Sequence, residues 1–578
     1  MLTAVILPLI VFGLVLALLV YGLGEYLGWV YRDEMDAAEE MPGAMGYLTR
    51  YVEKPVFNPI EGFIYRVSGV DPDRSMGWKE YFLAGLLLNL VLFCFLYLVF
   101  ILQGFLPLNP EGFGGVSWDL AFHNASTFVS NTNQQHYSGE VSLTYFSQIF
   151  AAVLAMFLSA GTGMAYMVGF ARGLLNRENP ELGNFYTAFV KAVLRFLLPV
   201  SFLLAVFLVI EGVPQTFRGA LEVETLEGVR QTIARGPVAV LEAIKMFGTN
   251  GGGFFGANAA HPYENPTPFT NVVLNLFLLA SPMATIYAFG VWMRKRRHGL
   301  VILGAVSTIF VLLLVVGVWG ELGPNPGLKE LGVDQTVGNM EGKETRFGPV
   351  MSALWGVSTT STTSGAVNSM HDSFTPVGSL SLFLAMSMNC LFAGVGTGLL
   401  NLLTYILICT FIGALMIGRA PSYLGKRVEP YEVKWAAIII LLLPTLVLFP
   451  TSLALITDMG KAGITNPGYH GLSQIIYEFF SAAANNGSGF EGLIDNTPFY
   501  NIACGLVILV ARYIPILLQM MIAGSFARKK IRPETAGTLK VENFSFLVLF
   551  VGVLVIISGL VFIPALALGP ITEILQTL

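Results

Sequence analysis

The stretch GPVAVLEAIKMFGTNGGG, residues 236–253, decides the fold of this chain. It carries about three turns of helical apolar pattern, too short to cross a bilayer, which takes about 20 residues. It ends in small polar residues and lies between two long apolar runs, an arrangement typical of a re-entrant helix followed by an extended loop. Three further stretches share this design: WDLAFHNASTFVSNTNQQ (118–135), GPVMSALWGVSTTSTTSG (348–365) and GLSQIIYEFFSAAANNGSG (471–489).

These stretches recur at near-equal spacing. Their equivalent points are Asn133, Gly251, Gly365 and Gly487, separated by 118, 114 and 122 residues. Any one of them, taken alone, fits an ordinary glycine-rich loop. Four at this spacing predict an internal repeat: four helix–pore-loop–helix units around one pore, with one extra helix at each end.

The composition agrees with a membrane protein. Only 12% of the 578 residues are charged and 54% are hydrophobic, with a net charge of −5. Soluble proteins carry about 25% charged residues, so a soluble multi-domain fold is excluded, and the unbroken apolar runs exclude the alternating strands of a membrane β-barrel. The sequence predicts an all-α integral membrane protein with ten transmembrane helices. They lie near 3–30, 82–103, 143–170, 184–211, 271–292, 300–320, 379–418, 435–457, 499–526 and 544–567.

The same runs divide the chain into units. The first apolar run exceeds the apolar region of a signal peptide and is expected to be retained as a span. The predicted segments are an N-terminal transmembrane helix (1–30), a cytoplasmic loop (31–80), pore repeats 1 (81–170), 2 (184–292), 3 (300–418) and 4 (435–526), and a C-terminal transmembrane helix (544–578).

The distribution of Lys and Arg predicts the orientation. If the N-terminus is outside, the inner loops hold 21 basic residues and the outer loops hold 8. Because basic residues concentrate on the cytoplasmic side, we expect both termini and all four re-entrant loops to lie outside.

Convergent loops of this kind suit cation binding. A ring of backbone carbonyls can replace the hydration shell of an ion, and glycine allows the positive φ angles that such loops need. The windows 130–135, 249–253, 359–365 and 485–489 contain no Asp or Glu. This favours carbonyl coordination of a monovalent cation over a carboxylate site for calcium.

Acidic residues follow each window. They are Glu140, Glu264, Asp372, and Glu491 or Asp495, and basic residues are absent from 104–142, 256–270, 361–378 and 485–498. Two interpretations remain open: a negative outer mouth that concentrates cations, or ordinary solvated loop charges.

Two features inside the apolar runs stand out. Arg512 interrupts an apolar run, and an intramembrane charge marks a functional site by default; it either faces the vestibule below the loops or bonds structurally to helix ends. The glycines Gly394, Gly396 and Gly398 interrupt the run 379–418. They predict an unwound gate loop (394–398) with Arg419 at its inner end, or else a small-residue helix contact.

Other residue types point to little chemistry. The four cysteines, Cys94, Cys390, Cys409 and Cys504, lie in apolar runs and are predicted to be buried small hydrophobes, and the six histidines form no sequence cluster. An integral-membrane enzyme is a weak alternative, because the sequence shows no catalytic set.

Several long motifs resemble a known family. They are SNTNQQ-x-YSGE (130–140), GTNGGGFFGANAAHPYENP (248–266), STTSTTSGAVNSM (358–370), GVGTGL (394–399), MIGRAPSYLGK (416–426) and AAANNGSGFEGL (482–493). Together they resemble the potassium-translocating A subunit of the bacterial Kdp-type P-type ATPase, within the superfamily of K⁺ transporters, over essentially the whole chain.

The resemblance implies a K⁺ selectivity filter, a gate and tunnel entrance at Gly394, Gly396, Gly398, Arg419 and Arg512, and the bacterial cytoplasmic (inner) membrane. The implied filter residues are Asn131, Thr132, Asn133, Gln135, Thr249, Asn250, Gly251, Thr363, Ser364, Gly365, Asn485, Asn486 and Gly487. Two positions depart from the family pattern: Asn389 replaces a glutamate before the gate loop, and Gln134 replaces an aromatic residue beside the first filter segment.

The expected function is that of a K⁺-binding, channel-like subunit of an ATP-driven uptake complex. The chain has no Walker A or D-K-T-G-T motif, so ATP hydrolysis requires a partner P-type ATPase subunit. The resemblance adds small single-span subunits as partners; no cofactor is expected besides K⁺ as substrate. The alternative is a standalone K⁺ channel or a Na⁺-coupled K⁺ symporter of the same superfamily.

Overall fold

The computed structural model describes residues 2–33, 35, 43–532 and 540–577. In this part of the chain, ten helices are long and apolar enough to cross a membrane, which confirms the predicted all-α integral membrane class. The crossing helices are α1 (Leu2–Val30), α4 (Trp78–Leu102), η4 and α7 (Ser147–Val153, Leu154–Leu175), α8, η5 and α9 (Phe185–Lys191, Ala192–Leu197, Leu198–Ile210), α11 (Pro268–Trp292), α12 (Arg296–Leu322), α16 (Thr397–Met416), α17 (Pro430–Ile456), α20 (Pro498–Ala527) and α21 (Phe544–Leu566).

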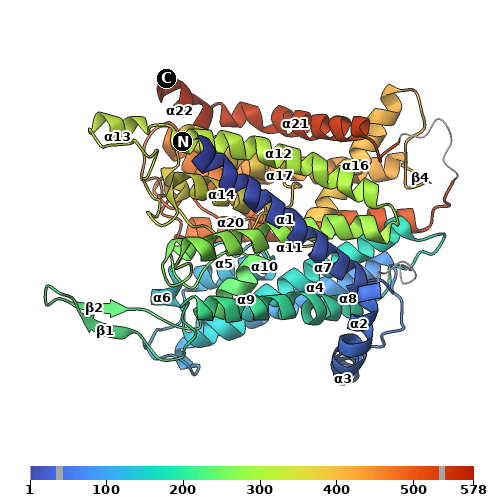
Figure 1. The fold of residues 1–578 in the computed structure, drawn as a ribbon, viewed down its shortest axis with the longest axis horizontal. Coiled ribbons are helices and arrows are strands. Elements are labelled where there is room, and N and C mark those ends of the chain that lie inside the picture. Colours follow the sequence, from blue (N-terminus) through green and yellow to red (C-terminus); the bar gives the residue numbers. More distant parts are fainter. Residues whose placement is uncertain (1, 34, 36–42, 533–539, 578) are drawn as a thin grey trace.

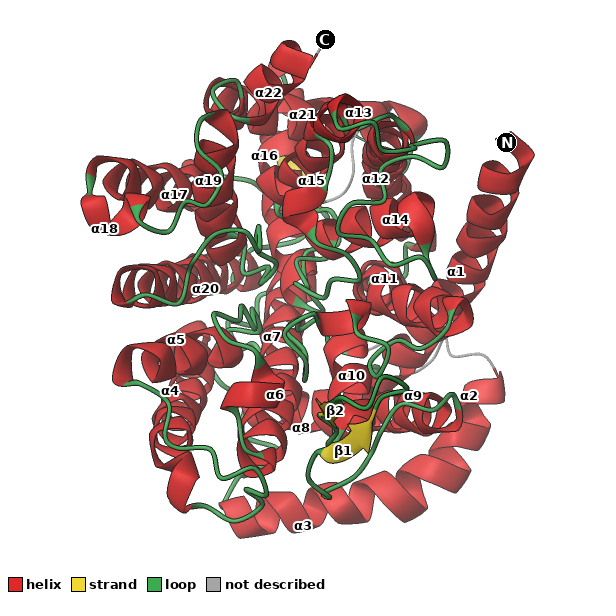
Figure 2. Ribbon diagram, turned by 90° about the vertical axis from the view of Figure 1, so that its left-hand side faces the viewer, coloured by secondary structure: helices red, strands yellow, loops and turns green. Residues whose placement is uncertain are grey.

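Four short helices occupy the predicted re-entrant positions. They are α5 (Trp118–Val129), α10 (Val238–Phe247), α14 (Gly348–Ser361) and α19 (Tyr469–Ala483). Each contacts both the preceding and the following apolar helix of its own unit. The loops that follow them gather in the middle of the helix ring (Figure 2).

The run 379–418, which the sequence predicts to be unwound at its glycine cluster, is divided into two helices. It consists of α15 (Pro376–Met388) and the spanning helix α16, separated by an irregular segment. At 1.5 Å per residue the 13 residues of α15 reach only about 20 Å. Asn389, Gly394 and Gly396 take φ angles of 42°, 78° and 87°, a conformation that no α-helix accommodates.

The remaining elements lie at the two ends of the bundle. Both chain ends and the hairpin of β1 and β2 lie at one end, and α2 and α3 lie near the other (Figure 1). These elements are α2 (Gly43–Leu48), η2 (Thr49–Phe57), α3 (Asn58–Ser68), η3 (Gln103–Phe105), α6 (Gly139–Ser142), β1 (Leu221–Glu224), β2 (Arg230–Ile233), η6 (Asn258–Ala260), α13 (Pro326–Glu330), η7 (His371–Ser373), β3 (Ser422–Tyr423), β4 (Lys426–Arg427), α18 (Asp458–Lys461) and α22 (Pro570–Thr577). Both strand pairs are antiparallel, and the sequence analysis predicted neither.

Candidate functional site

The loops after the four pore helices share one backbone signature. Positive φ angles occur at Asn131 (65°), Thr249 (48°), Thr363 (46°) and Asn485 (52°), and again two residues later at Asn133 (52°), Gly251 (103°), Gly365 (79°) and Gly487 (108°). Residues of positive and negative φ that alternate can turn successive carbonyl groups toward the same side, whereas a β-strand alternates them. Four segments more than 100 residues apart therefore adopt the conformation that a carbonyl-lined pore needs.

These four loops, together called the filter loops, lie edge to edge in chain order. An ideal Cβ on each of three glycines would lie within 3.0 Å of a carbonyl oxygen on the next loop; the pairs are Gly251 with Ser364, Gly365 with Asn486, and Gly487 with Thr132. The ring closes between the first and second loops, where Asn133 Nδ2 donates to the Gly251 carbonyl at 3.3 Å. Only glycine fits at the three glycine positions.

The amide side chains of the filter loops brace the ring. Asn131 Nδ2 donates to the Thr249 carbonyl at 3.2 Å, and Gln135 Nε2 donates to the Gly253 carbonyl at 2.9 Å. Similar bonds join Asn485 to Thr132 (3.1 Å), Asn486 to Thr359 (3.0 Å) and Asn250 to Met156 (3.1 Å). These side chains hold neighbouring segments together.

In each filter loop, the carbonyl oxygen of the residue between the two positive-φ positions is free for an ion. No described group donates a hydrogen bond to the carbonyl oxygens of Thr132, Asn250, Ser364 or Asn486, and all four residues are fully buried. The carboxyl ends of four pore helices lead into the same loops, and each adds about half a negative charge. The arrangement favours a dehydrated cation at the centre of the ring.

The segment between α15 and α16 lies directly against the filter loops. The Gly394 N–H donates to the Thr362 carbonyl at 2.6 Å, and the Val395 N–H donates to Thr249 Oγ1 at 2.8 Å. Gly396 also packs on α7, because a Cβ there would lie 2.7 Å from the Gly163 backbone. The loop is thus both unwound and a small-residue contact, so the two sequence interpretations were not exclusive. Gly398 lies in the first turn of α16, where a Cβ would meet the Phe392 carbonyl at 2.6 Å.

Arg512 lies beneath the filter loops. Its Nη1 donates to Thr397 Oγ1 at 3.1 Å, beside the segment between α15 and α16. With Thr363, Asn389 and Asn485 it lines a cavity of about 60 Å³. Arg512 therefore borders the cavity that Thr363 and Asn485, which follow two of the pore helices, also line.

Arg419 does not lie where the sequence analysis expected. It follows the carboxyl end of α16 and is exposed, whereas Gly394 and Gly396 precede the amino end of that helix. Twenty helical residues separate the two places by about 30 Å. Arg419 is therefore distant from the loop that it was predicted to flank.

The acidic residues after the filter loops have different environments. Glu140 is half-buried and accepts a hydrogen bond from the Gly256 N–H at 2.9 Å, and Glu491 is exposed and accepts from the His371 N–H at 3.2 Å. In contrast, Glu264 is fully buried and pairs with Lys245 at 2.7 Å. Lys245 also pairs with the buried Glu242, so the two carboxylates share one ammonium group. Because Glu264 is buried, it is neither an exposed charge of the mouth nor a solvated loop charge, and both interpretations are wrong for this residue.

Asp372 is also compensated. It is buried and lies 3.0 Å from His470 Nε2, and the other ring nitrogen of His470 lies 3.4 Å from Glu573 on α22. Burial lowers the pKa of His470, but its hydrogen bonds to the two carboxylates outweigh this effect and raise the pKa to about 10. His470 is therefore charged at neutral pH and links α19 to η7 and α22.

The sequence analysis missed a polar cluster beside the first filter loop. His136 bonds to Glu478 at 3.0 Å and to Asn501 at 2.7 Å, and its ring stacks on His123 at 3.7 Å. Burial lowers the pKa of His136, but Asp495 and Glu478 outweigh it and raise the pKa to about 9. Gln134, one of the two departures, donates from Nε2 to Glu478 at 2.7 Å. Glu478 is separated from His136 by 342 residues, so no local pattern could reveal the contact.

A ring of four re-entrant loops within ten membrane-length helices defines a channel-like, multi-pass membrane transport protein. The chain belongs to the potassium-transporting ATPase A subunit family, whose model matches residues 10–575. It is 50% identical to the potassium-transporting ATPase potassium-binding subunit of Halobacterium salinarum over 98% of both chains. It is 46% identical to the subunit of that name from Caldanaerobacter subterraneus, over 90% of this chain and 93% of the other. Among solved structures, the potassium transporter TrkH from Vibrio parahaemolyticus is similar over 89% of this chain and 98% of its own, at 14% identity and a TM-score of 0.49.

Proposed function

We propose that this chain is the K⁺-binding, channel-like subunit of an ATP-driven uptake complex. One observation carries the proposal: the same φ signature recurs in four loops that form a closed ring of carbonyl oxygens. Carbonyl dipoles without carboxylates suit a monovalent cation. Membership of the potassium-transporting ATPase A subunit family specifies K⁺ as that cation.

In this proposal the thirteen filter residues named above form the K⁺ site. The carbonyl oxygens of Thr132, Asn250, Ser364 and Asn486, which accept no hydrogen bond from a described group, hold the ion, and the other filter residues shape and brace the ring. Glu140 raises the local cation concentration at the mouth. Glu491 adds its charge only at alkaline pH, because desolvation by the surrounding protein and the neighbouring Asp372 raise the pKa of its carboxyl group to about 8. The loop that contains Gly394 and Val395 is the gate, because the N–H groups of these two residues donate hydrogen bonds to the Thr362 carbonyl and the Thr249 hydroxyl. Arg512 beneath it opposes free passage, so that K⁺ is diverted toward a partner subunit.

The energy source is a partner P-type ATPase subunit. The sequence offers neither a Walker A nor a D-K-T-G-T motif, and the relatives are named as subunits of an ATPase. Small single-span subunits complete the proposed complex. The chain itself needs no cofactor, and K⁺ is its substrate.

The proposed location is the bacterial cytoplasmic membrane with both termini outside. The Lys and Arg distribution supports this orientation. The proposed division keeps the four pore repeats 81–170, 184–292, 300–418 and 435–526, because one pore helix and one filter loop fall within each.

Purification and reconstitution test the proposal. A tagged chain should bring down a P-type ATPase, and the complex in liposomes should show K⁺-stimulated ATP hydrolysis with ATP-dependent uptake. If the chain purifies alone and its liposomes carry passive K⁺ current, it is a standalone channel. If a Na⁺ gradient drives its K⁺ uptake without ATP, it is a symporter.

A further inference from the structure

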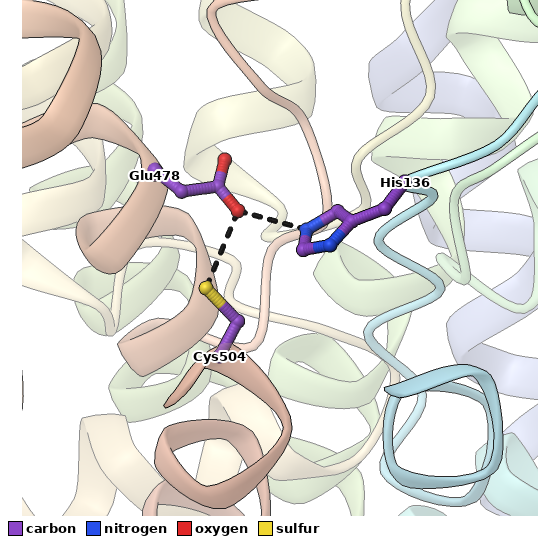
Figure 3. A group of neighbouring side chains, drawn as sticks. All are labelled: His136, Glu478 and Cys504. Atoms are coloured by element: carbon purple, nitrogen blue, oxygen red, sulfur yellow. Dashed lines mark hydrogen bonds and ion pairs between the residues drawn. The ribbon is translucent and has the colours of Figure 1, made fainter. Parts of the chain in front are cut away.

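Three side chains with metal-binding atoms meet beside the first filter loop. His136 follows that loop, Glu478 lies on α19 and Cys504 lies on α20, and all three point toward one another (Figure 3). Glu478 Oε1 lies 3.0 Å from His136 Nε2 and 3.4 Å from Cys504 Sγ. The ligand atoms all lie within 4.8 Å of one another, and the three residues are at most 2% exposed.

These separations approach those of a tetrahedral metal site. Nitrogen, oxygen and sulfur ligands bind Zn²⁺ at about 2.0 to 2.3 Å, which places neighbouring ligand atoms about 3.3 to 3.6 Å apart at tetrahedral angles. The two observed distances are shorter by only a few tenths of an ångström. Small rotations of the side chains would open the triangle enough for an ion.

The neighbours of His136 fix which nitrogen faces the triangle. Asn501 Nδ2 donates to Asp119 Oδ2 at 2.8 Å, so its Oδ1 is the atom that accepts from His136 Nδ1 at 2.7 Å. The proton on Nδ1 is thereby held, and Nε2 points at Glu478. Metal-binding histidines use this arrangement, in which the outer nitrogen donates to a fixed acceptor.

We propose that His136, Glu478 and Cys504 form a binding site for a borderline-soft divalent cation of the Zn²⁺ or Cd²⁺ type. Thiolate and imidazole ligands favour such ions over Mg²⁺ or Ca²⁺. Asp495 Oδ2, 3.9 Å from His136 Nε2, is placed to become the fourth ligand.

Charge balance supports the exchange of protons for the metal. Binding requires the thiol of Cys504 and the imidazolium of His136 each to release one proton. One divalent ion then replaces two protons, so the total charge of the cluster with Glu478 and Asp495 is unchanged. The buried cluster therefore accepts the ion without a change in its net charge.

The site is connected to the filter through Glu478. The same Oε1 atom accepts the hydrogen bond of Gln134 Nε2 at 2.7 Å, and Gln134 lies between two filter residues, Asn133 and Gln135. A metal that takes this lone pair competes with the Gln134 bond. Occupancy should therefore disturb the first filter loop and inhibit K⁺ transport.

Metal titration of the purified full-length chain with its natural partners tests the site. Zn²⁺ affinity is measured by competition with a chromophoric chelator, and Cd²⁺ binding by thiolate-to-cadmium charge-transfer absorbance. We expect about one site per chain. Cys504→Ser should weaken Zn²⁺ binding at least tenfold and abolish the Cd²⁺ absorbance, while Cys409→Ser, a buried cysteine on α16, should change neither.

The titration can either support or overturn the proposed metal site. Absence of stoichiometric Zn²⁺ binding, or equal affinity in wild type, Cys504→Ser and His136→Gln, overturns the site. If Cys504→Ser does not assemble, His136→Gln carries the same affinity test. Because the titration requires no transport, it is independent of the proposed K⁺ function. Inhibition of uptake by Zn²⁺ that Cys504→Ser relieves would establish the connection to the filter.

Discussion

The backbone N–H of Val395 donates to the hydroxyl oxygen of Thr249 at 2.8 Å, 146 residues away in the chain. Thr249 is a filter residue with a positive φ of 48°, and Val395 lies in the unwound segment between α15 and α16. A single hydroxyl thus joins the second filter loop to the proposed gate. A change at either residue can therefore act on the other segment through this bond.

Thr249→Val should weaken the attachment of the proposed gate loop to the second filter loop. The substitution keeps the side-chain shape but leaves the buried Val395 N–H without an acceptor, a cost of about 1–3 kcal/mol. We expect passive tracer efflux from liposomes, without ATP, to rise severalfold. Thr249→Ser keeps the acceptor and should behave as wild type; equal efflux from the two variants would contradict the gating role.

Gly251→Ala should impair K⁺ selectivity. Its φ of 103° is unfavourable for alanine, and the new Cβ would collide with the Ser364 carbonyl. We expect the K⁺ concentration for half-maximal ATPase activity to rise at least tenfold, and discrimination against Na⁺ to fall; Gly251→Asp should act more strongly. Gly212 is the control, because it also has a positive φ, 97°, but faces open space. Gly212→Ala should cost about 1–2 kcal/mol of stability without changing K⁺ affinity.

Arg512→Gln should increase leakage without unfolding the protein. A unit charge about 10 Å from an ion, in a medium of effective dielectric constant about 20, is worth about 1.7 kcal/mol, or more than tenfold in occupancy. We expect faster passive K⁺ efflux and fewer ions moved per ATP, with Arg512→Lys retaining tight coupling. Loss of both variants from the membrane would instead indicate a structural arginine.

His470 should make stability pH-dependent above neutrality. Its pKa is raised from 6.5 to about 10 in the folded protein, so its contribution is complete below pH 6.5 and is lost as pH rises from 6.5 through 10. The difference in unfolding temperature between wild type and His470→Gln should therefore shrink across this interval. A difference that stays constant from pH 6 to 10 would refute the ionic link to Asp372 and Glu573.

Glu264→Gln should affect folding, whereas Glu140→Gln should affect ion attraction. Loss of the Glu264 charge disturbs the buried cluster that it forms with Lys245 and Glu242, and removing one partner of a buried ion pair costs up to about 3–5 kcal/mol. We expect a lower unfolding temperature for Glu264→Gln.

Glu140→Gln should leave stability unchanged and weaken apparent K⁺ affinity only at low ionic strength, because salt screens the attraction between a carboxylate and a cation in solution. If the loss of affinity does not depend on salt, Glu140 does not attract K⁺ by its charge.

Local pattern was sufficient for the architecture. The apolar runs predicted the ten spans, and the short helical stretches that end in small polar residues predicted four re-entrant segments, because length and hydropathy are properties of consecutive residues. The glycines Gly251, Gly365 and Gly487 were found in the same way, since the backbone conformation that they permit is local. The break at Asn389 was visible only as a glycine-rich interval inside one long run.

The sequence by itself therefore determined the class of fold, the fourfold repeat and the positions of the filter loops. Only the tertiary structure decided which side chains meet. Glu264 is buried against Lys245, Arg419 lies a full helix away from the proposed gate, and His136, Glu478 and Cys504 converge. The physical reason is that hydropathy and backbone preference act between near neighbours in the chain. Burial and ion pairing depend instead on how helices hundreds of residues apart pack together.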